Sequence, residues 1–109
     1  MTKIRIYKDG TGSYKGFQCR DHAGSGEYGF DIVCAAISVL TINTINSLEQ
    51  LTRDTFELTQ DEDLGLIEVG FTHPLSDEGR LLMDSYVIGV HSIEESYGSQ
   101  YIQVFHEEV

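Results

Sequence analysis

The strongest constraint on the fold is an apolar segment in the first half of the chain. Residues 31–48 are predicted to form a helix whose first three turns are apolar almost all the way round. Those turns contain Ile32, Val33, Ala35, Ala36, Ile37, Val39, Leu40 and Ile42. A helix of this composition must be covered on most of its sides. We therefore expect it to be the central element of one domain that spans residues 1–109.

The rest of the chain predicts five strands and a second helix. Short alternating or β-branched segments bounded by turn residues are typical of strands. They lie at residues 2–8, 13–20, 56–60, 64–72 and 101–106. The second helix is predicted at residues 75–97, with Pro74 in its first turn, Gly98 at its C-terminal cap, and close backbone contacts at Gly79 and Gly89. The order ββαββαβ predicts a small α/β sandwich of the α+β type, in which a mostly antiparallel sheet packs with two helices.

The charge of the chain limits the partners that it can bind. It has 18 acidic and 7 basic residues, for a formal net charge of -11. Nucleic acids and anionic membranes bind through Lys and Arg, so such a surface argues against both. A basic protein partner fits this charge, which would also speed their encounter.

The cysteines and the apolar runs indicate the cellular location of the protein. The longest apolar run, residues 32–42, is about half the roughly 20 residues of a membrane-spanning helix, and Ser38 and Thr41 interrupt it. The N-terminus has no apolar signal-peptide core. Two cysteines without an export signal indicate thiols rather than a disulfide. We expect a cytoplasmic location.

Cys34 is the candidate nucleophile. If Asp31 caps the apolar helix, Cys34 is its third residue, where backbone N–H groups have no partner within the helix. Those groups and the helix dipole stabilise a thiolate, and they can hold the oxyanion of a tetrahedral intermediate. Ser38 lies one turn further along and is a candidate supporting residue.

His22 is the candidate general base. It would take the proton of the thiol and return it to the leaving amine. The loop that joins it to the helix contains Gly24, Gly26 and Gly29, which make it mobile enough to close over a bound peptide. Asp31 is a helix cap on spacing alone, and it is also placed to orient the imidazole.

Other interpretations stay open at this point. A cysteine in an apolar helix is commonly a small buried residue, and the residues alone leave that role and the nucleophile equally supported. Cys19 lies in a strand and is assigned a structural role. Cys19, His22, Cys34 and His73 are conceivable zinc ligands, but the spacing of a second ligand pair is absent. His73, His91 and His106 are expected to be surface or strand residues.

These residues resemble the ribosomal-processing cysteine proteases known as Prp. The family pattern is close to Gly-His-Ala, a glycine-containing loop, and then Gly-x-Asp-x-Val-Cys-Ala-Ala-(Val/Ile)-Ser. The chain contains the matching residues His22, Ala23, Gly24, Gly29, Asp31, Val33, Cys34, Ala35, Ala36, Ile37 and Ser38. The length and the element order also resemble the family along the whole chain. One departure is Asp21, which stands where the family usually has Gly before the histidine.

The resemblance implies a specific function. It implies that Cys34 is the nucleophile and His22 the general base, with Asp31 in a supporting position. It implies a cysteine endopeptidase that removes a short N-terminal extension from a bacterial large-subunit ribosomal protein, after a pair of aromatic residues. It also implies a homodimer with a flexible loop over the site, at residues 24–30 here, and it calls for no cofactor or metal. The alternative is a non-enzymatic acidic module that binds a basic ribosomal or assembly partner.

Overall fold

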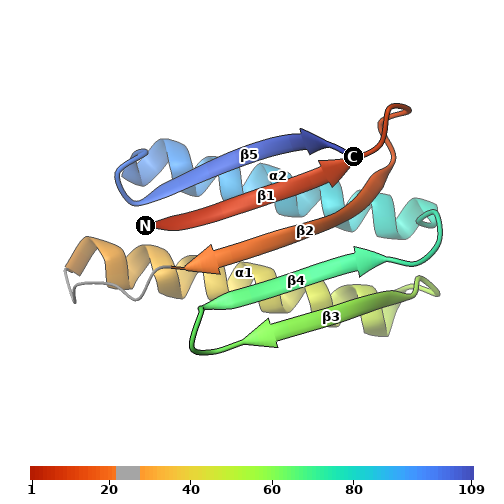
Figure 1. Cartoon of the computed structure of the whole chain (residues 1–109), viewed down its shortest axis with the longest axis horizontal. Helices are drawn as coiled ribbons and strands as arrows, with labels where there is room; N and C mark the ends of the chain where they lie inside the picture. Colours follow the sequence, from red (N-terminus) through yellow and green to blue (C-terminus); the bar gives the residue numbers. More distant parts are fainter. Residues whose placement is uncertain (22–27) are drawn as a thin grey trace.

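The chain folds into one mixed sheet and two helices. The computed structural model describes residues 1–21 and 28–109. The elements are β1 (Thr2–Lys8), β2 (Tyr14–Asp21), α1 (Tyr28–Leu51), β3 (Phe56–Asp61), β4 (Leu66–Phe71), α2 (Asp77–Tyr97) and β5 (Ile102–Glu108). Figure 1 shows both helices on the same side of the sheet. This arrangement confirms the predicted order and the predicted α/β sandwich.

The sheet places β1 between two partners. Its strand order is β3-β4-β2-β1-β5, as can be followed in Figure 1. Three of the pairs are antiparallel, and β1 pairs with β5 in parallel. Ile4 of β1 stands opposite Cys19 of β2 on one side and Val104 of β5 on the other. Because both edges of β1 are paired, its side chains are held in fixed positions.

The core lies between the sheet and the helices. Alternate residues of β1 (Thr2, Ile4 and Ile6) are fully buried and belong to the side that packs on the helices. The buried apolar residues are Ile4, Ile6, Tyr14, Phe17, Cys19, Val33, Ile37, Ile45, Leu48, Val69, Met83, Tyr86, Val90 and Ile102. The hydroxyls of Thr41 and Tyr86 are 2.9 Å apart across the two helices. That bond satisfies both polar groups inside the core.

Helix α1 begins earlier than the sequence indicated. It starts at Tyr28 instead of Asp31 and ends at Leu51 instead of Leu48. Asp31 is therefore not the cap but lies in the first turn, and Gly29 is helical rather than part of a loop. An acidic residue is favourable at a cap and also in the first turn, where it complements the positive end of the helix. The presence of an acidic residue at position 31 therefore could not show whether Asp31 is the cap or a residue of the first turn.

Helix α2 begins two residues later than predicted. Ser76 is its N-cap, and the Ser76 hydroxyl accepts a hydrogen bond from the Gly79 N–H at 3.1 Å. The Asp54 carboxylate in turn accepts bonds from the Ser76 N–H (2.8 Å) and hydroxyl (2.7 Å). Leu75 precedes the cap and is not helical. The predicted cap at Gly98 is confirmed, with a φ of 97°.

The two interior glycines of α2 do have close neighbours, but these are side chains. A Cβ at Gly79 would collide with the Asp54 carboxylate, and one at Gly89 would lie 2.6 Å from Cδ2 of Leu40. The expected close approach at the two glycines is therefore confirmed, with side chains as the neighbours. Gly89 lets α1 and α2 approach each other, and Gly79 leaves room for the carboxylate that supports the Ser76 cap.

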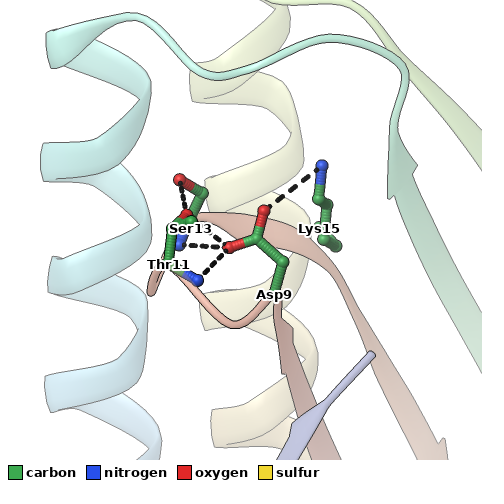
Figure 2. A network of polar contacts seen from close by, with 4 residues as sticks. All are labelled: Asp9, Thr11, Ser13 and Lys15. Carbon is green, nitrogen blue, oxygen red and sulfur yellow. Dashed lines mark hydrogen bonds and ion pairs between the residues drawn. The ribbon is translucent and has the colours of Figure 1, made fainter.

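The hairpin between β1 and β2 closes through one carboxylate, which Figure 2 shows. Asp9 Oδ1 accepts bonds from the Thr11 N–H (2.9 Å), the Thr11 hydroxyl (2.6 Å) and the Ser13 N–H (3.1 Å). Lys15 Nζ lies 3.6 Å from Asp9 Oδ2. These bonds, that from the Thr11 hydroxyl above all, hold the pKa of Asp9 below its usual range. They explain why the turn forms at the position that the sequence predicted.

Helix α1 is apolar on its outer side as well. Its segment from Asp31 to Leu51 has a mean hydropathy of 1.5, which by length and composition alone would suffice to cross a membrane. Here it packs against the sheet and α2, as the core helix of a folded domain does. Only 33% of the segment is buried, and Val39 is 70% exposed. The prediction that this helix is covered on most of its sides is therefore wrong for the single chain.

Two histidines join α2 to β5. The Nε2 atoms of His91 and His106 are 2.8 Å apart, and the ring planes lie within 8° of each other. The other ring nitrogen of His91 is 3.2 Å from Glu94, and Glu94 also accepts from the Val104 N–H at 2.7 Å. A hydrogen bond between two imidazoles needs one Nε2 without a proton. Partial burial, with His91 and Lys8 nearby, lowers the pKa of His106 and outweighs the opposite effect of Glu94.

The histidine pair predicts a loss of stability in mild acid. Because the pKa of His106 is lower in the folded chain, the unfolded chain binds a proton first as the pH falls below about 6.5. The free energy of unfolding should therefore decrease as the pH is lowered from 7.5 to 5.5. The measurement is the melting temperature at each pH, with His106→Gln as the control. An equal decrease in that variant would exclude His106 as the source.

Candidate active site

Cys34 opens into a cavity between α1 and the sheet. The cavity has a volume of about 230 Å³. Its walls come from four parts of the fold: α1, β1, β2 and the hairpin between β3 and β4. The lining residues are Thr2, Cys19, Cys34, Ile37, Ser38, Gln60, Asp61, Glu62, Gly65, Leu66 and Ile67. The thiol is partly exposed there, which a nucleophile requires.

The position of Cys34 within α1 differs from the prediction. Since α1 begins at Tyr28, Cys34 is its seventh residue, not its third. In an α-helix, the N–H of residue 34 bonds the carbonyl of residue 30, so it cannot hold an oxyanion. The N–H groups that have no partner within this helix precede residue 31, about one turn or more before Cys34. The helix dipole also weakens beyond the first turn and acts less strongly on the thiol than expected.

Thr2 supplies a polar neighbour for the sulfur that the sequence did not indicate. Its Oγ1 lies 3.8 Å from Cys34 Sγ, and either atom can be the donor. Thr2 belongs to β1, 32 positions before the cysteine, and is 1% exposed. No local sequence pattern could have found this contact, because it depends on how β1 packs against α1.

Cys19 is buried at the same cavity. It lies in β2, is 5% exposed, and pairs with Ile4 and with Ile67 of the neighbouring strands. This burial agrees with the structural role assigned to it. Both cysteines are thiols.

The remaining predicted site residues have varied positions. Ser38 is exposed at the cavity wall, one turn beyond Cys34. Asp31 is exposed in the first turn of α1, one turn before Cys34. The predicted base His22 and the predicted loop residues Gly24 and Gly26 lie outside the described residues. The roles of these five residues stay predictions.

The zinc interpretation gains no support from the described residues. Among residues 1–21 and 28–109, no three His, Cys, Asp or Glu side chains are grouped so that they could hold a metal. His73 follows the far end of β4, whereas Leu66 at its start lines the cavity. Seven residues of extended chain span about 24 Å, and this length separates His73 from the part of β4 that lines the cavity. The ring nitrogen Nδ1 of His73 instead lies near the hydroxyls of Thr55 (3.2 Å) and Thr72 (3.1 Å).

The β3–β4 hairpin forms one wall of the cavity and was missed as part of the site. Gln60, Asp61 and Glu62 come to the same cavity as Cys34. The turn is held by the Asp61 carboxylate, which accepts a bond from the Leu64 N–H at 3.2 Å. The sequence predicted strands at residues 56–60 and 64–72, which implies a turn between them, but nothing in it indicated that this turn lies beside the cysteine.

The cavity suits attack on an extended peptide. Ile37, Leu66 and Ile67 are apolar residues of the cavity that Cys34 lines, and the hairpin adds the carboxylates of Asp61 and Glu62. An apolar side chain of a peptide fits such a wall, which would bring the adjoining carbonyl carbon to Cys34. The chemistry that this geometry supports is acyl transfer to sulfur.

Comparison with known proteins identifies relatives along nearly the whole chain. The family described as the cysteine protease Prp matches residues 1–103. The ribosomal processing cysteine protease Prp of Staphylococcus aureus is 32% identical over 76 residues, which are 70% of this chain and 72% of that protein. The corresponding protein of Bacillus subtilis is 28% identical over 85 residues, which cover 74% and 76% of the two chains.

Solved structures agree with the fold. The S. aureus ribosomal processing protease Prp in complex with a substrate peptide has a TM-score of 0.90 and 25% identity, and the match covers 98% of this chain and 100% of that one. The same protease with a covalently linked product peptide has a TM-score of 0.87 and 26% identity, with the same coverage.

The exposure of the two thiols predicts different reactivities. Iodoacetamide near neutral pH should modify Cys34 fully before Cys19 is measurably modified, because Cys19 is buried in the sheet. Peptide mapping by mass spectrometry over a time course measures both rates in one sample. Unfolding the chain in urea provides the control, since both thiols should then react alike. Equal rates in the folded chain would contradict this geometry.

Proposed function

The chain belongs to the Prp family of cysteine proteases, and we propose that it removes a short N-terminal extension from a large-subunit ribosomal protein. The observation that carries this proposal is the partly exposed thiol of Cys34 in a cavity with apolar walls. The S. aureus relative is known with a substrate peptide and with a covalently linked product peptide. The alternative of a non-enzymatic acidic module is set aside, because the family consists of proteases.

The proposed reaction uses Cys34 as nucleophile and His22 as base. His22 takes the thiol proton, and the sulfur bonds to the carbonyl carbon of the scissile peptide. When the tetrahedral intermediate collapses, the C–N bond breaks and the leaving amine receives the proton from His22. Water then attacks the thioester, releases the new carboxyl terminus and restores the thiol. No cofactor takes part in these steps.

The charge of the enzyme supports a basic protein as substrate. The net charge is -11, and Asp61 and Glu62 lie at the wall of the cavity that contains Cys34. Ribosomal proteins bind RNA and are commonly basic, so electrostatic attraction would speed their encounter with this surface. The same charge disfavours direct contact with RNA or with an anionic membrane. We place the enzyme in the cytoplasm, where such a substrate is made.

Incubation with a synthetic peptide that carries the ribosomal extension tests the reaction and the substrate together. Mass spectrometry should show one cut, after the aromatic pair of the extension. Cys34→Ala and His22→Ala should each reduce the rate on the order of 10³-fold or more, as loss of a nucleophile or its base does elsewhere.

The controls for this experiment concern the fold and the sequence of the peptide. Circular dichroism should show that both variants remain folded. A peptide with its aromatic pair replaced by alanine should not be cut. An active Cys34→Ala enzyme would exclude Cys34 as the nucleophile, whereas an uncut extension peptide would exclude the substrate.

We further propose that the enzyme is a homodimer that associates through the outer sides of its helices. A hollow of about 630 Å³ lies there between the two helices, and its lining includes Ala35, Val39 and Leu40 of α1 and Gly89 and Ile93 of α2. The segment of α1 from residue 32 to residue 48 contains no charged residue. Two chains of charge -11 repel each other over most of their surface, so a charge-free face favours self-association.

The size of this face is sufficient for a dimer. Helix α2 has 21 residues. Two neighbouring helices of such length present roughly 600 Å² per copy, near the ~800 Å² per partner of a typical stable interface.

A charge placed on the outer helix face should separate the dimer. Ile88 of α2 is 68% exposed, and Ile88→Asp should raise the dimer dissociation constant about ten-fold or more, because it buries a charge in an apolar contact. Sedimentation velocity over a concentration series measures this constant. Leu58→Asp, at an exposed position of the edge strand β3, is the matched control and should have no effect. Dissociation by Leu58→Asp instead would assign the interface to the sheet edge.

A further inference from the structure

The cavity contains one buried hydroxyl that faces the sulfur. Thr2 Oγ1 lies 3.8 Å from Cys34 Sγ, and Thr2 is 1% exposed. It occupies the side of β1 that also buries Ile4 and Ile6. A valine in its place would fill nearly the same volume without a polar group to satisfy. The hydroxyl therefore stands where packing alone favours an apolar residue.

The position of Thr2 is set by three elements. Its backbone pairs with β2 on one side and with Ile102 of β5 on the other. The Thr2 N–H also donates to the carbonyl of Tyr101 at 2.9 Å. A β-branched side chain has few rotamers, so a fixed backbone gives a fixed hydroxyl. The oxygen is thus held in place before the substrate binds.

A hydrogen-bond donor of this kind stabilises a thiolate at Cys34. The N–H groups of α1 that have no partner within the helix precede residue 31, about one turn or more before the cysteine. Two side chains that line the cavity, Asp61 and Glu62, are acidic and oppose a negative charge on the sulfur. Asp31 adds a third acidic group, which lies on the helix that contains Cys34, one turn before it. A hydroxyl within reach of the sulfur offsets part of this repulsion.

We propose that Thr2 is a positioning residue for the nucleophile, whose hydroxyl donates to the Cys34 thiolate and directs the sulfur into the cavity. The inference rests on the proposed role of Cys34 as nucleophile. Thr2 itself makes no bond with the substrate. When the sulfur is protonated, the same pair can reverse, with the thiol donating to Thr2 Oγ1. The bond is stronger in the charged form, so it favours the thiolate.

The test is the rate of alkylation of Cys34 by iodoacetamide as a function of pH. Thr2→Val removes the hydroxyl and keeps the shape. We expect the midpoint of the alkylation profile of this variant to lie at higher pH than that of the unmodified chain. Below the midpoint, the variant should be alkylated about three- to ten-fold more slowly, which is the effect of losing a weak bond to a charged group. Above the midpoint both rates should converge, because both sulfurs are then thiolates. Thr2→Ser retains the hydroxyl and should restore most of the original profile.

A matched control separates this effect from a general loss of packing. Thr44 is also a buried threonine, and its hydroxyl donates to the Leu40 carbonyl within α1 at 2.8 Å. Thr44→Val should leave the alkylation profile unchanged. If Thr2→Val does not fold, Thr2→Ala removes the same hydroxyl without any added bulk.

Two results would overturn the proposal. One is an unchanged midpoint in a folded Thr2→Val or Thr2→Ala chain. The other is a decrease that is equal at every pH, which would mean that only access to the thiol has changed. Alkylation needs no peptide substrate, so this test stands apart from the cleavage experiment. If the unmodified enzyme does not cut the extension peptide but the alkylation midpoint of Thr2→Val is shifted, the proposed substrate is rejected. If the peptide is cut but the midpoint of Thr2→Val is unchanged, the role of Thr2 is rejected.

Discussion

The packing of α1 against the paired strands β1 and β2 is the contact on which the rest of the structure depends. Val33 and Ile37 on the inner side of the helix are buried with Ile4 and Ile6 of the sheet. Cys34 follows Val33 on this helix and is partly exposed at the cavity, with its sulfur 3.8 Å from Thr2 Oγ1 of β1. The β3–β4 hairpin is joined to β2 through β4 and completes the cavity around it. The contacts that form the core therefore also form the cavity.

The electrostatics of the site differ from those of a simple helix-terminus thiol. Cys34 is the seventh residue of its helix, and the cavity walls include two carboxylates in a chain of net charge -11. These features favour a basic substrate, yet they oppose the negative charge that Cys34 would carry as the proposed nucleophile. The proposed roles of the Thr2 hydroxyl and of His22 would each offset part of this opposition. The same acidity is the reason why we place the proposed dimer contact at the uncharged stretch of α1, residues 32–48.

Parts of the fold were predictable because they depend on short-range physics. Strand β1 is predicted by the alternation of apolar and polar residues over seven positions. The turn after it depends on Asp9, and the end of α2 depends on Gly98. The start of α1 was not predictable from Asp31, since an acidic residue suits both a cap and a first turn. Nor was the start of α2, where the Ser76 cap depends on Asp54, 22 positions away. The exposure of Val39 also depends on what covers the helix, which hydropathy alone does not reveal.

By itself the sequence determined the element order, the acidic composition, and the choice of Cys34 and His22 as candidates, since the histidine, the cysteine and their motif can be read within one short segment, residues 22–38. Tertiary structure alone decided which groups surround the sulfur. Thr2 comes from the start of the chain, Cys19 from the second strand, and Asp61 from a hairpin after the helix. They meet because strands distant in sequence become neighbours in the sheet, and no local pattern records that pairing.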